Sequence, residues 1–183
     1  MSMDKSEARK AAFGRRKGAF GQGLDAAAQA HLREALAGCE GKPLAGYMPI
    51  RTEIDPVPVM AGWAAPVGVP VIQGKGQALK FHRWQPDCEM VDGPFGARVP
   101  AVAEEVVPEV LIVPLVAFDA KGYRLGYGGG FYDRTLEGLR AARRTVAIGY
   151  AFSAQAMEDV PLEPTDQRLD AMVTEAGVTW FRG

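Results

Sequence analysis

The sequence predicts an α/β fold, a single three-layer domain in which helices cover both faces of a mainly parallel sheet. In the second half of the chain, short apolar runs alternate with an amphipathic helical segment, as is typical of parallel sheets. The 183 residues fit one domain, taken here as 1–183. The apolar content of 48% and the charged content of 23% are those of an ordinary globular protein.

Two helices are expected at the N-terminal end. The first runs from Asp4 to about Phe20, where small and basic residues recur at three- and four-residue intervals. Gly21-Gln22-Gly23 ends it, and Asp25 is the expected N-cap of a second helix that runs to Ala37. The residues of the recurring stripe are Ala8, Ala11, Ala12, Arg15 and Ala19.

Short strands and prolines alternate in the middle of the chain. Pro56 and Pro58 exclude a regular strand around them, so a loop or the first turn of a helix is expected there. Residues 85–108 hold four prolines and are expected to be irregular, which in a compact domain is often functional or mobile. The predicted strands are residues 44–50, 69–73 and 78–84, the last two joined as a hairpin by Gly74-Lys75-Gly76.

A glycine-rich loop follows the most apolar run of the sequence. Residues 111–118 are predicted to form a buried strand, Gly126–Gly130 a loop and Phe131–Ala142 a helix. Further strands are predicted at residues 145–150, 169–174 and 178–181.

The loop has the composition of a phosphate-binding site. Consecutive glycines allow positive φ angles, so several backbone N–H groups can point into one concavity. The following helix adds the positive end of its dipole. Asp133 falls in its first turn, where a carboxylate can hold magnesium beside phosphates. Arg124 and Arg134 bracket the loop and can neutralise phosphate charge.

A tight turn that only lets the helix pack on the sheet is the alternative interpretation of this loop. The loop lacks the Gly-Lys-Ser/Thr ending of the Walker pattern, and it does not match the dinucleotide pattern in its strict form.

The net charge and the cysteine content limit the kinds of partner and compartment that are expected. A net charge of −1 gives no basic field for nucleic acid or an anionic membrane, so an anionic ligand needs a local site. Cys39 and Cys88 are expected to be unpaired thiols of a cytoplasmic protein. No apolar run is long enough to span a membrane, and a monomer or weak dimer is expected.

The segment Arg124–Arg134, preceded by Pro114–Asp119, resembles the signature of the 5-formyltetrahydrofolate cyclo-ligase family, also called methenyltetrahydrofolate synthetases. The resemblance extends over nearly the whole chain. Further segments that fit the family, in its order, are Lys5-x-x-x-Arg9, Glu53-Ile54-Asp55, Phe81 and Trp84 with Gly93-x-Phe95-Gly96, and Asp166-x-x-x-Asp170-Ala171-Met172-Val173-Thr174-Glu175.

The resemblance implies a reaction that uses ATP and Mg²⁺. ATP phosphorylates the formyl oxygen of 5-formyltetrahydrofolate, and the folate N10 then displaces phosphate to give 5,10-methenyltetrahydrofolate. Phosphorylation turns a poor leaving group into a good one, and phosphoryl transfer needs positioning and charge neutralisation above all.

The resemblance also implies roles for individual residues. Arg124 and Tyr132 would be catalytic, and Asp133 and Asp170 would hold magnesium. Folate would contact Glu53, Phe81, Trp84 and Tyr132. ATP would contact Lys5, Arg9, Gly126, Tyr127, Gly128, Gly129, Gly130, Phe131, Tyr132 and Asp133.

Simpler interpretations of these residues stay open on the sequence alone. Lys5 and Arg9 also fit a solvated basic helix face, and Glu53 an exposed loop acid. Asp170 also fits a solubilising strand edge. Phe81 and Trp84 also fit a plain core, as alternating strand residues commonly do.

The sequence departs from the family pattern at three places. Tyr127 stands where many members have Arg, and Thr165 where many have His. Ala97-Arg98-Val99-Pro100 replaces the usual Ile-x-x-Pro. Three hypotheses therefore remain, namely the cyclo-ligase, a related ATP-dependent enzyme with another substrate, and a non-catalytic folate- or nucleotide-binding protein.

Overall fold

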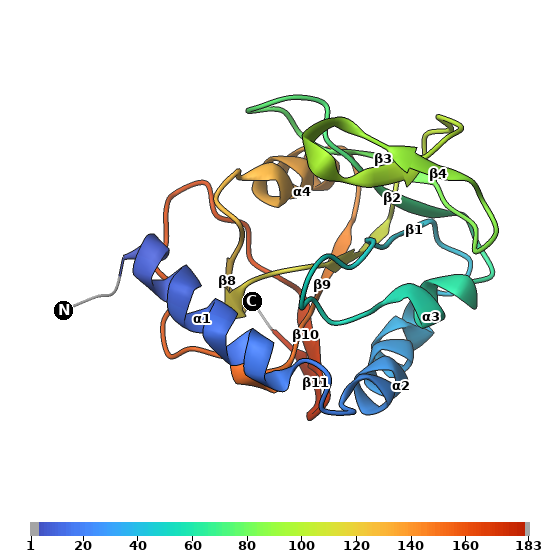
Figure 1. Cartoon of the computed structure of the whole chain (residues 1–183). Coiled ribbons are helices and arrows are strands. Elements are labelled where there is room, and N and C mark those ends of the chain that lie inside the picture. The colour runs from blue at the N-terminus through green and yellow to red at the C-terminus, as the bar shows by residue number, and fades with distance from the viewer. Residues whose placement is uncertain (1–3, 182–183) are drawn as a thin grey trace.

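A mixed seven-stranded sheet lies at the centre of the computed structural model, which describes residues 4–181 (Figure 1). Its strands are β1 (Leu44–Ala45), β2 (Val67–Val71), β3 (Lys80–Arg83), β6 (Val110–Val113), β9 (Val146–Tyr150), β10 (Ala171–Thr174) and β11 (Gly177–Trp180). Their order is β11-β10-β9-β6-β1-β2-β3. The strands from β10 to β2 are parallel, and β11 and β3 add an antiparallel strand at each edge.

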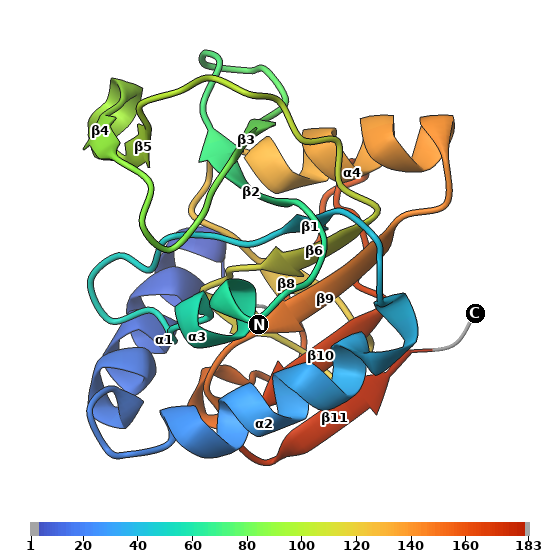
Figure 2. The same cartoon turned by 90° about the vertical axis from the view of Figure 1, so that its right-hand side faces the viewer.

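Helices cover both faces of this sheet, as predicted. The α-helices are α1 (Lys5–Ala19), α2 (Asp25–Leu36), α3 (Val57–Ala61) and α4 (Phe131–Ala142), and the 3₁₀ turns are η1 (Ala37–Cys39), η2 (Pro94–Gly96) and η3 (Ser153–Gln155). Figure 2 shows α4 above the sheet and α2 below it. Within residues 4–181, no helix is both long and apolar enough to cross a membrane.

Two cores lie on the two faces of the sheet because strand side chains alternate between faces. In β6, Val110 and Ile112 pack in the core that holds α2 and α3. Leu111 and Val113 pack in the core that holds Leu136 of α4. All four β6 side chains are therefore buried, as expected for a central parallel strand covered on both faces.

A small ribbon attaches α1 to the rest of the fold. The ribbon consists of β7 (Ala117–Phe118) and β8 (Arg124–Leu125), paired antiparallel. Ala8 and Ala12 of α1 pack with Ala117 and Leu125 in a third buried cluster. Small side chains let the helix approach closely, so the basic residues of α1 reach the glycine loop that follows β8.

The strand order reverses between β1 and β6, because β2 is added beside β1 on one side and β9 beside β6 on the other. The connection from β1 to β2 passes through α3 on one face, and the connection from β6 to β9 passes through α4 on the other face. The two connections leave a crevice at the carboxyl ends of β1 and β6, where open α/β sheets commonly bind ligands.

The helix starts and the buried stripe of α1 differ in part from the sequence prediction. Asp25 is the first residue of α2, and its N-cap is Leu24, which makes no side-chain cap bond. The buried residues of α1 include Arg16, whereas Ala11, which is exposed, and Arg15 do not belong to the buried stripe. Arg15 instead donates from Nε to the carbonyl oxygen of Ala154 at 2.7 Å.

Several predicted strands are shorter in the structure, whereas β2 and β11 keep the predicted length with shifted bounds. The run 111–118 is divided into β6 and β7 because Pro114 has no N–H for a strand ladder. Of 44–50, only Leu44–Ala45 form the strand β1, and Tyr47, Met48 and Ile50 line the crevice. The stretch 85–108 contains a further ribbon of β4 (Met90–Asp92) and β5 (Arg98–Pro100). The predicted bounds of α4 are confirmed.

Candidate active site

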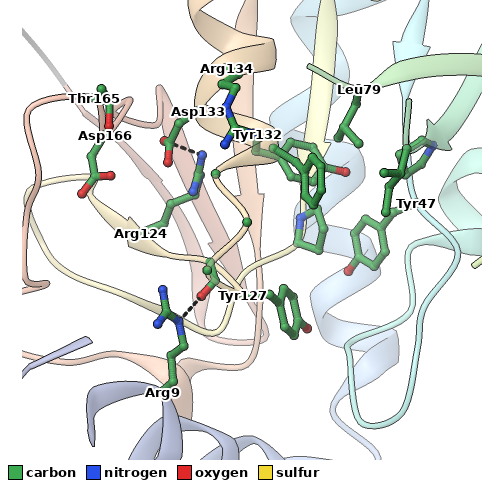
Figure 3. Close-up of a pocket in the computed structure, with 18 of the residues that line it drawn as sticks. Arg9, Tyr47, Leu79, Arg124, Tyr127, Tyr132, Asp133, Arg134, Thr165 and Asp166 are labelled. Atoms are coloured by element: carbon green, nitrogen blue, oxygen red, sulfur yellow. Dashed lines mark hydrogen bonds and ion pairs between the residues drawn. The ribbon is translucent and has the colours of Figure 1, made fainter. Parts of the chain in front are cut away.

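A cavity of about 530 Å³ opens at the carboxyl ends of β1, β2 and β6. Tyr47 follows β1, Ile72 follows β2 and Pro114 follows β6, and all three line it. Figure 3 shows this cavity between the glycine loop and the segment that carries Tyr47. Its size is that of a site for a small molecule or cofactor.

The glycine loop forms one wall of the cavity and requires glycine at specific positions. Gly130 has φ +68 at the start of α4, a conformation that side chains disfavour. A Cβ at Gly129 would lie 2.6 Å from the Phe131 ring. Because no side chain caps α4, the N–H groups of its first turn are available for an anion.

Buried donors without partners face the same wall. Among residues 4–181, four buried side-chain atoms make no hydrogen bond. Three of them, Nε of Arg124, Nη1 of Arg134 and the hydroxyl of Tyr132, belong to residues that line the cavity, and the fourth is the hydroxyl of Tyr150. Leaving buried donors unpaired costs free energy, so such groups indicate a missing partner. Three donors around an uncapped helix start are the kind of partners that an anionic group such as a phosphate needs.

The predicted basic residues of α1 reach the cavity. Nε of Arg9 donates to the carbonyl oxygen of Gly126 at 2.7 Å, which fixes the guanidinium beside Gly128 (Figure 3). Nζ of Lys5 lies 3.3 Å from carboxylate oxygens of both Glu163 and Asp166. Lys5 and Arg9 are therefore cavity residues rather than a solvated helix face.

Two aspartates, Asp133 and Asp166, line the cavity. Oδ1 of Asp133 accepts from Nη2 of Arg124 at 2.8 Å and from the backbone N of Gln167 at 2.9 Å. Both contacts fall on Oδ1, and no donor among residues 4–181 bonds Oδ2, which leaves this oxygen free for a ligand. Oδ2 of Asp166 accepts from Lys5 and from the backbone N of Glu163.

The structure does not bring Asp170 to this cavity. Its Oδ2 accepts from the backbone N of Ala147 at 2.7 Å and from Nη2 of Arg140 at 3.0 Å, at the start of β10. The predicted pair of Asp133 and Asp170 is therefore not assembled on the cavity wall, where Asp133 lies with Asp166. Among residues 4–181, no group of three or more His, Cys, Asp or Glu side chains is placed to hold a metal ion.

A magnesium ion fits this wall only if the protein and bound phosphates coordinate it together. Mg²⁺ typically binds one or two carboxylates, several waters and substrate phosphates, rather than a complete protein cage. Asp133 has a free Oδ2 and lies near protein donors that have no hydrogen-bond partner and could bind phosphate. The wall can therefore supply one carboxylate to an ion that phosphates also bind.

The opposite wall is apolar around one buried acid. Glu53 is 6% exposed, and Oε1 accepts from the backbone N of Ile50 at 2.9 Å. Burial raises the pKa of Glu53, although hydrogen bonds from Tyr127 and Ile50 and the charge of Arg16 oppose the rise. The apolar residues of this wall are Tyr47, Met48, Ile50, Pro70, Ile72 and Leu79.

Phe81 and Trp84 are core residues rather than cavity residues. Phe81 is 2% exposed and packs in the α4 core, and Trp84 is 5% exposed and packs in the α2 core. Neither lines the cavity, so the apolar wall described above replaces them as the surface that a flat ring would contact.

Tyr132 lies between the two walls. It lines the cavity, and its hydroxyl is buried without a partner. Burial and the nearby Glu53 carboxylate raise the pKa of Tyr132, so its hydroxyl remains a donor at neutral pH.

The sequence prediction missed Arg16, although a signal for it exists. Arg16 stands seven residues after Arg9, two helical turns along, and so shares the face of α1 that meets the glycine loop. Nη1 of Arg16 donates to the hydroxyl of Tyr127 at 2.6 Å.

A family model described as the 5-formyltetrahydrofolate cyclo-ligase family matches residues 10–175. The chain belongs to the 5-formyltetrahydrofolate cyclo-ligase family. Its members are ATP-dependent ligases, so the phosphate-binding features of the glycine wall agree with the family.

Similar proteins of known name carry the same designation. The 5-formyltetrahydrofolate cyclo-ligase of Escherichia coli is 42% identical over 105 residues, which are 55% of this chain and 57% of that protein. The one of Mycolicibacterium smegmatis is 29% identical over 157 residues, which are 78% of this chain and 79% of that protein. The matched part thus spans only about half of the Escherichia coli relative.

Two solved structures share the fold over nearly the whole chain. The 5,10-methenyltetrahydrofolate synthetase of Aquifex aeolicus superposes with a TM-score of 0.80 at 30% identity, covering 99% of this chain and 94% of that one. The one of Mycoplasma pneumoniae superposes with a TM-score of 0.74 at 25% identity, covering 94% of this chain and 99% of that one. The three-layer α/β architecture is therefore that of the family.

Proposed function

We propose that this protein converts 5-formyltetrahydrofolate to 5,10-methenyltetrahydrofolate with ATP and Mg²⁺. The observation that carries the proposal is one cavity with two different walls. An uncapped helix start with three unpaired buried donors faces a buried acid in an apolar surface. The first wall suits a triphosphate, and the second suits a flat ring whose N–H groups need an acceptor.

The glycine wall would hold the triphosphate. Backbone N–H groups of the first turn of α4 would meet phosphate oxygens, and Arg9, Arg124 and Arg134 would neutralise their charge. Lys5 would also bind the phosphates once they displace the carboxylates of Glu163 and Asp166 from its ammonium group. Fixed donors of this kind stabilise the charge that develops during phosphoryl transfer.

Asp133 is the proposed carboxylate for magnesium. Mg²⁺ held by this carboxylate would supply positive charge against the phosphates. The protein's own contribution is the position of Asp133, which Arg124 and the backbone of Gln167 hold through Oδ1. Asp170 remains the second sequence-based candidate, and its contacts with Arg140 and Ala147 would have to change for it to take part.

Glu53 would bind the pterin edge of the folate, and Tyr47 and Ile50 would contact its ring. The formyl oxygen would then face Tyr132, whose unpaired hydroxyl can donate to it or to the transferred phosphoryl group. After phosphorylation of that oxygen, N10 would attack the formyl carbon. Phosphate would leave with the oxygen, and N10 would lose its proton.

The experiment measures the absorbance of 5,10-methenyltetrahydrofolate formed from 5-formyltetrahydrofolate, with ATP or magnesium omitted in turn. The proposal expects product only when both are present. A folded protein that forms no product from this folate but hydrolyses ATP with another folate or acyl compound would favour the related enzyme. Binding of ATP and folate without turnover would favour the non-catalytic alternative.

We further propose a cytoplasmic location and a monomer or weak dimer. Cys39 and Cys88 are both free thiols, as suits a reducing compartment. Gel filtration of the protein and cell fractionation test the two parts of this proposal.

A further inference from the structure

Three side chains connect α1, the glycine loop and the acid of the apolar wall. Nη1 of Arg16 donates to the hydroxyl of Tyr127 at 2.6 Å, and this hydroxyl donates to Oε2 of Glu53 at 2.6 Å. The hydroxyl thus accepts one hydrogen bond and donates one. Arg16, Tyr127 and Glu53 are called the relay below.

Arg16 is a rigid end of the relay. It is 2% exposed, and its Nε donates to Oγ1 of Thr52 at 2.9 Å. Its guanidinium carbon lies 5.0 Å from the ring centroid of Phe13 and 5.8 Å from that of Tyr127. Burying a charge costs free energy unless its donors are satisfied, and here a neutral hydroxyl and an aromatic pair take the place of a direct ion pair.

Glu53 is held at both oxygens. Oε1 accepts from the backbone N of Ile50, and Oε2 accepts from Tyr127. The carboxylate therefore has one orientation at the cavity wall. Although 46% of the surface of Tyr127 is exposed, its hydroxyl is enclosed between two buried side chains.

We propose that Tyr127, anchored by Arg16, is a positioning residue that orients the Glu53 carboxylate for the N–H groups of the folate ring. The backbone of Tyr127 belongs to the glycine loop, but its side chain turns away from the phosphate donors toward Glu53. The relay therefore determines the affinity for folate and leaves the affinity for ATP nearly unchanged. This inference rests on the proposed function, in which Glu53 binds the folate.

The relay also favours the ionised form of Glu53. The groups that face Glu53 are the hydroxyls of Tyr47, Tyr127 and Tyr132 and the guanidinium of Arg16. Burial raises the pKa of each tyrosine, so these hydroxyls stay neutral, and Arg16 is the group that brings positive charge to Glu53. Without the Tyr127 hydroxyl, the pKa of Glu53 rises further, because burial is opposed by one hydrogen bond fewer.

The decisive variant is Tyr127→Phe, which removes one oxygen and keeps the ring against Phe13 and Arg16. We expect the KM for 5-formyltetrahydrofolate to rise about tenfold or more, as for a lost hydrogen bond to a charged group. The kcat and the KM for ATP should stay within about twofold. Tyr123→Phe is the matched control, since Tyr123 is half-buried in the loop between β7 and β8, lies outside the cavity and should change neither KM.

Two further measurements separate positioning from packing. The acidic limb of the pH profile of kcat/KM for folate should move to higher pH in Tyr127→Phe, because ionised Glu53 is required. Carbon-13 NMR of glutamate carboxyls in the free protein, with Glu53→Gln to assign the signal, should show a higher pKa of Glu53 in this variant. Arg16→Lys keeps the charge without the guanidinium fork, and should raise the folate KM in the same direction.

The outcomes are distinct. An unchanged folate KM and unchanged Glu53 titration in Tyr127→Phe would overturn the inference while the wild type remains active. Equal increases in the KM for folate and for ATP would also overturn it, because the side chain would then act through the phosphate loop. A wild-type protein that neither turns over nor binds 5-formyltetrahydrofolate would refute the proposed function itself, and this inference with it.

Discussion

Asp133 is the residue at which the sequence prediction and the cavity agree most closely. Its Oδ1 is bound by Arg124 and Gln167, and the residue lines the cavity. Arg124 is 7% exposed and depends on this carboxylate as its ion-pair partner. Removal of the whole carboxylate would leave a buried cation unpaired, so an isosteric change is the better probe.

Asp133→Asn is predicted to lower turnover about 100-fold or more, because one fixed charge at the phosphate site is lost. Steady-state kinetics at several magnesium concentrations measure this effect. Asp170→Asn should lower turnover only about threefold or less if Asp170 stays bound to Arg140 and Ala147. A loss as large as that of Asp133→Asn would return Asp170 to the metal site. Asp159→Asn, at an exposed ion pair, serves as the control.

Glu53 predicts a pH-dependent stability. Burial raises its folded-state pKa above the ordinary value of 4.5, so the folded protein holds this proton more tightly than the unfolded chain. Its contribution to the free energy of unfolding is then fully present below pH 4.5 and is lost as pH rises through the folded pKa. Urea unfolding of wild type and Glu53→Gln across this range should show wild type losing stability relative to the variant. A constant difference would contradict a raised pKa.

Residue positions in loops were the hardest to predict. On a helix or strand, residue spacing identifies the side chains that share a face. Asp166 and Asp170 belong to an irregular connection before β10, where spacing does not reveal which way a side chain points. The choice between Arg15 and Arg16 failed for another reason. Both fit a three- or four-residue interval, and only the contacts with Thr52 and Tyr127 decide which one is buried.

At the scale of elements, the glycine loop and α4 act as one unit. The Phe131 ring packs so close to Gly129 that a Cβ on this residue would lie 2.6 Å from the ring. Gly130 adopts φ +68 at the start of the helix. The bounds of α4 were predictable because an amphipathic pattern follows directly after residues that break a helix. The length of β1 was not, because β1 ends after two residues while its neighbours β2 and β6 both continue, and no local pattern marks that end.

Gly129→Ala is predicted to raise the KM for ATP about tenfold, because the loop or the Phe131 ring must shift against the phosphate site. The KM for folate should change much less. Gly138→Ala is the control within α4, where a Cβ meets nothing within 4 Å. That control should stabilise the helix by about 0.5–1 kcal/mol without changing either KM. Equal KM values for ATP in wild type and Gly129→Ala would exclude this loop from the nucleotide site.

At the scale of the whole molecule, the sheet determines where the two walls meet. The alternation of apolar runs and helices predicted a parallel sheet, and the structure has five parallel strands with helices on both faces. The meeting of α1 with the loop after β8 depends on contacts between residues more than 100 positions apart, such as Arg9 and Gly126. Local patterns do not encode such contacts, so the resemblance to a family indicated them instead.

The most direct test follows the formyl oxygen of the substrate. 5-Formyltetrahydrofolate labelled with ¹⁸O in the formyl group is converted with ATP and magnesium, and ³¹P NMR detects the isotope shift of inorganic phosphate. The proposed mechanism predicts one ¹⁸O atom in each phosphate released, because that oxygen accepts the phosphoryl group and leaves with it. Unlabelled phosphate alongside 5,10-methenyltetrahydrofolate would refute this mechanism, since cyclisation would then not pass through a phosphorylated formyl group.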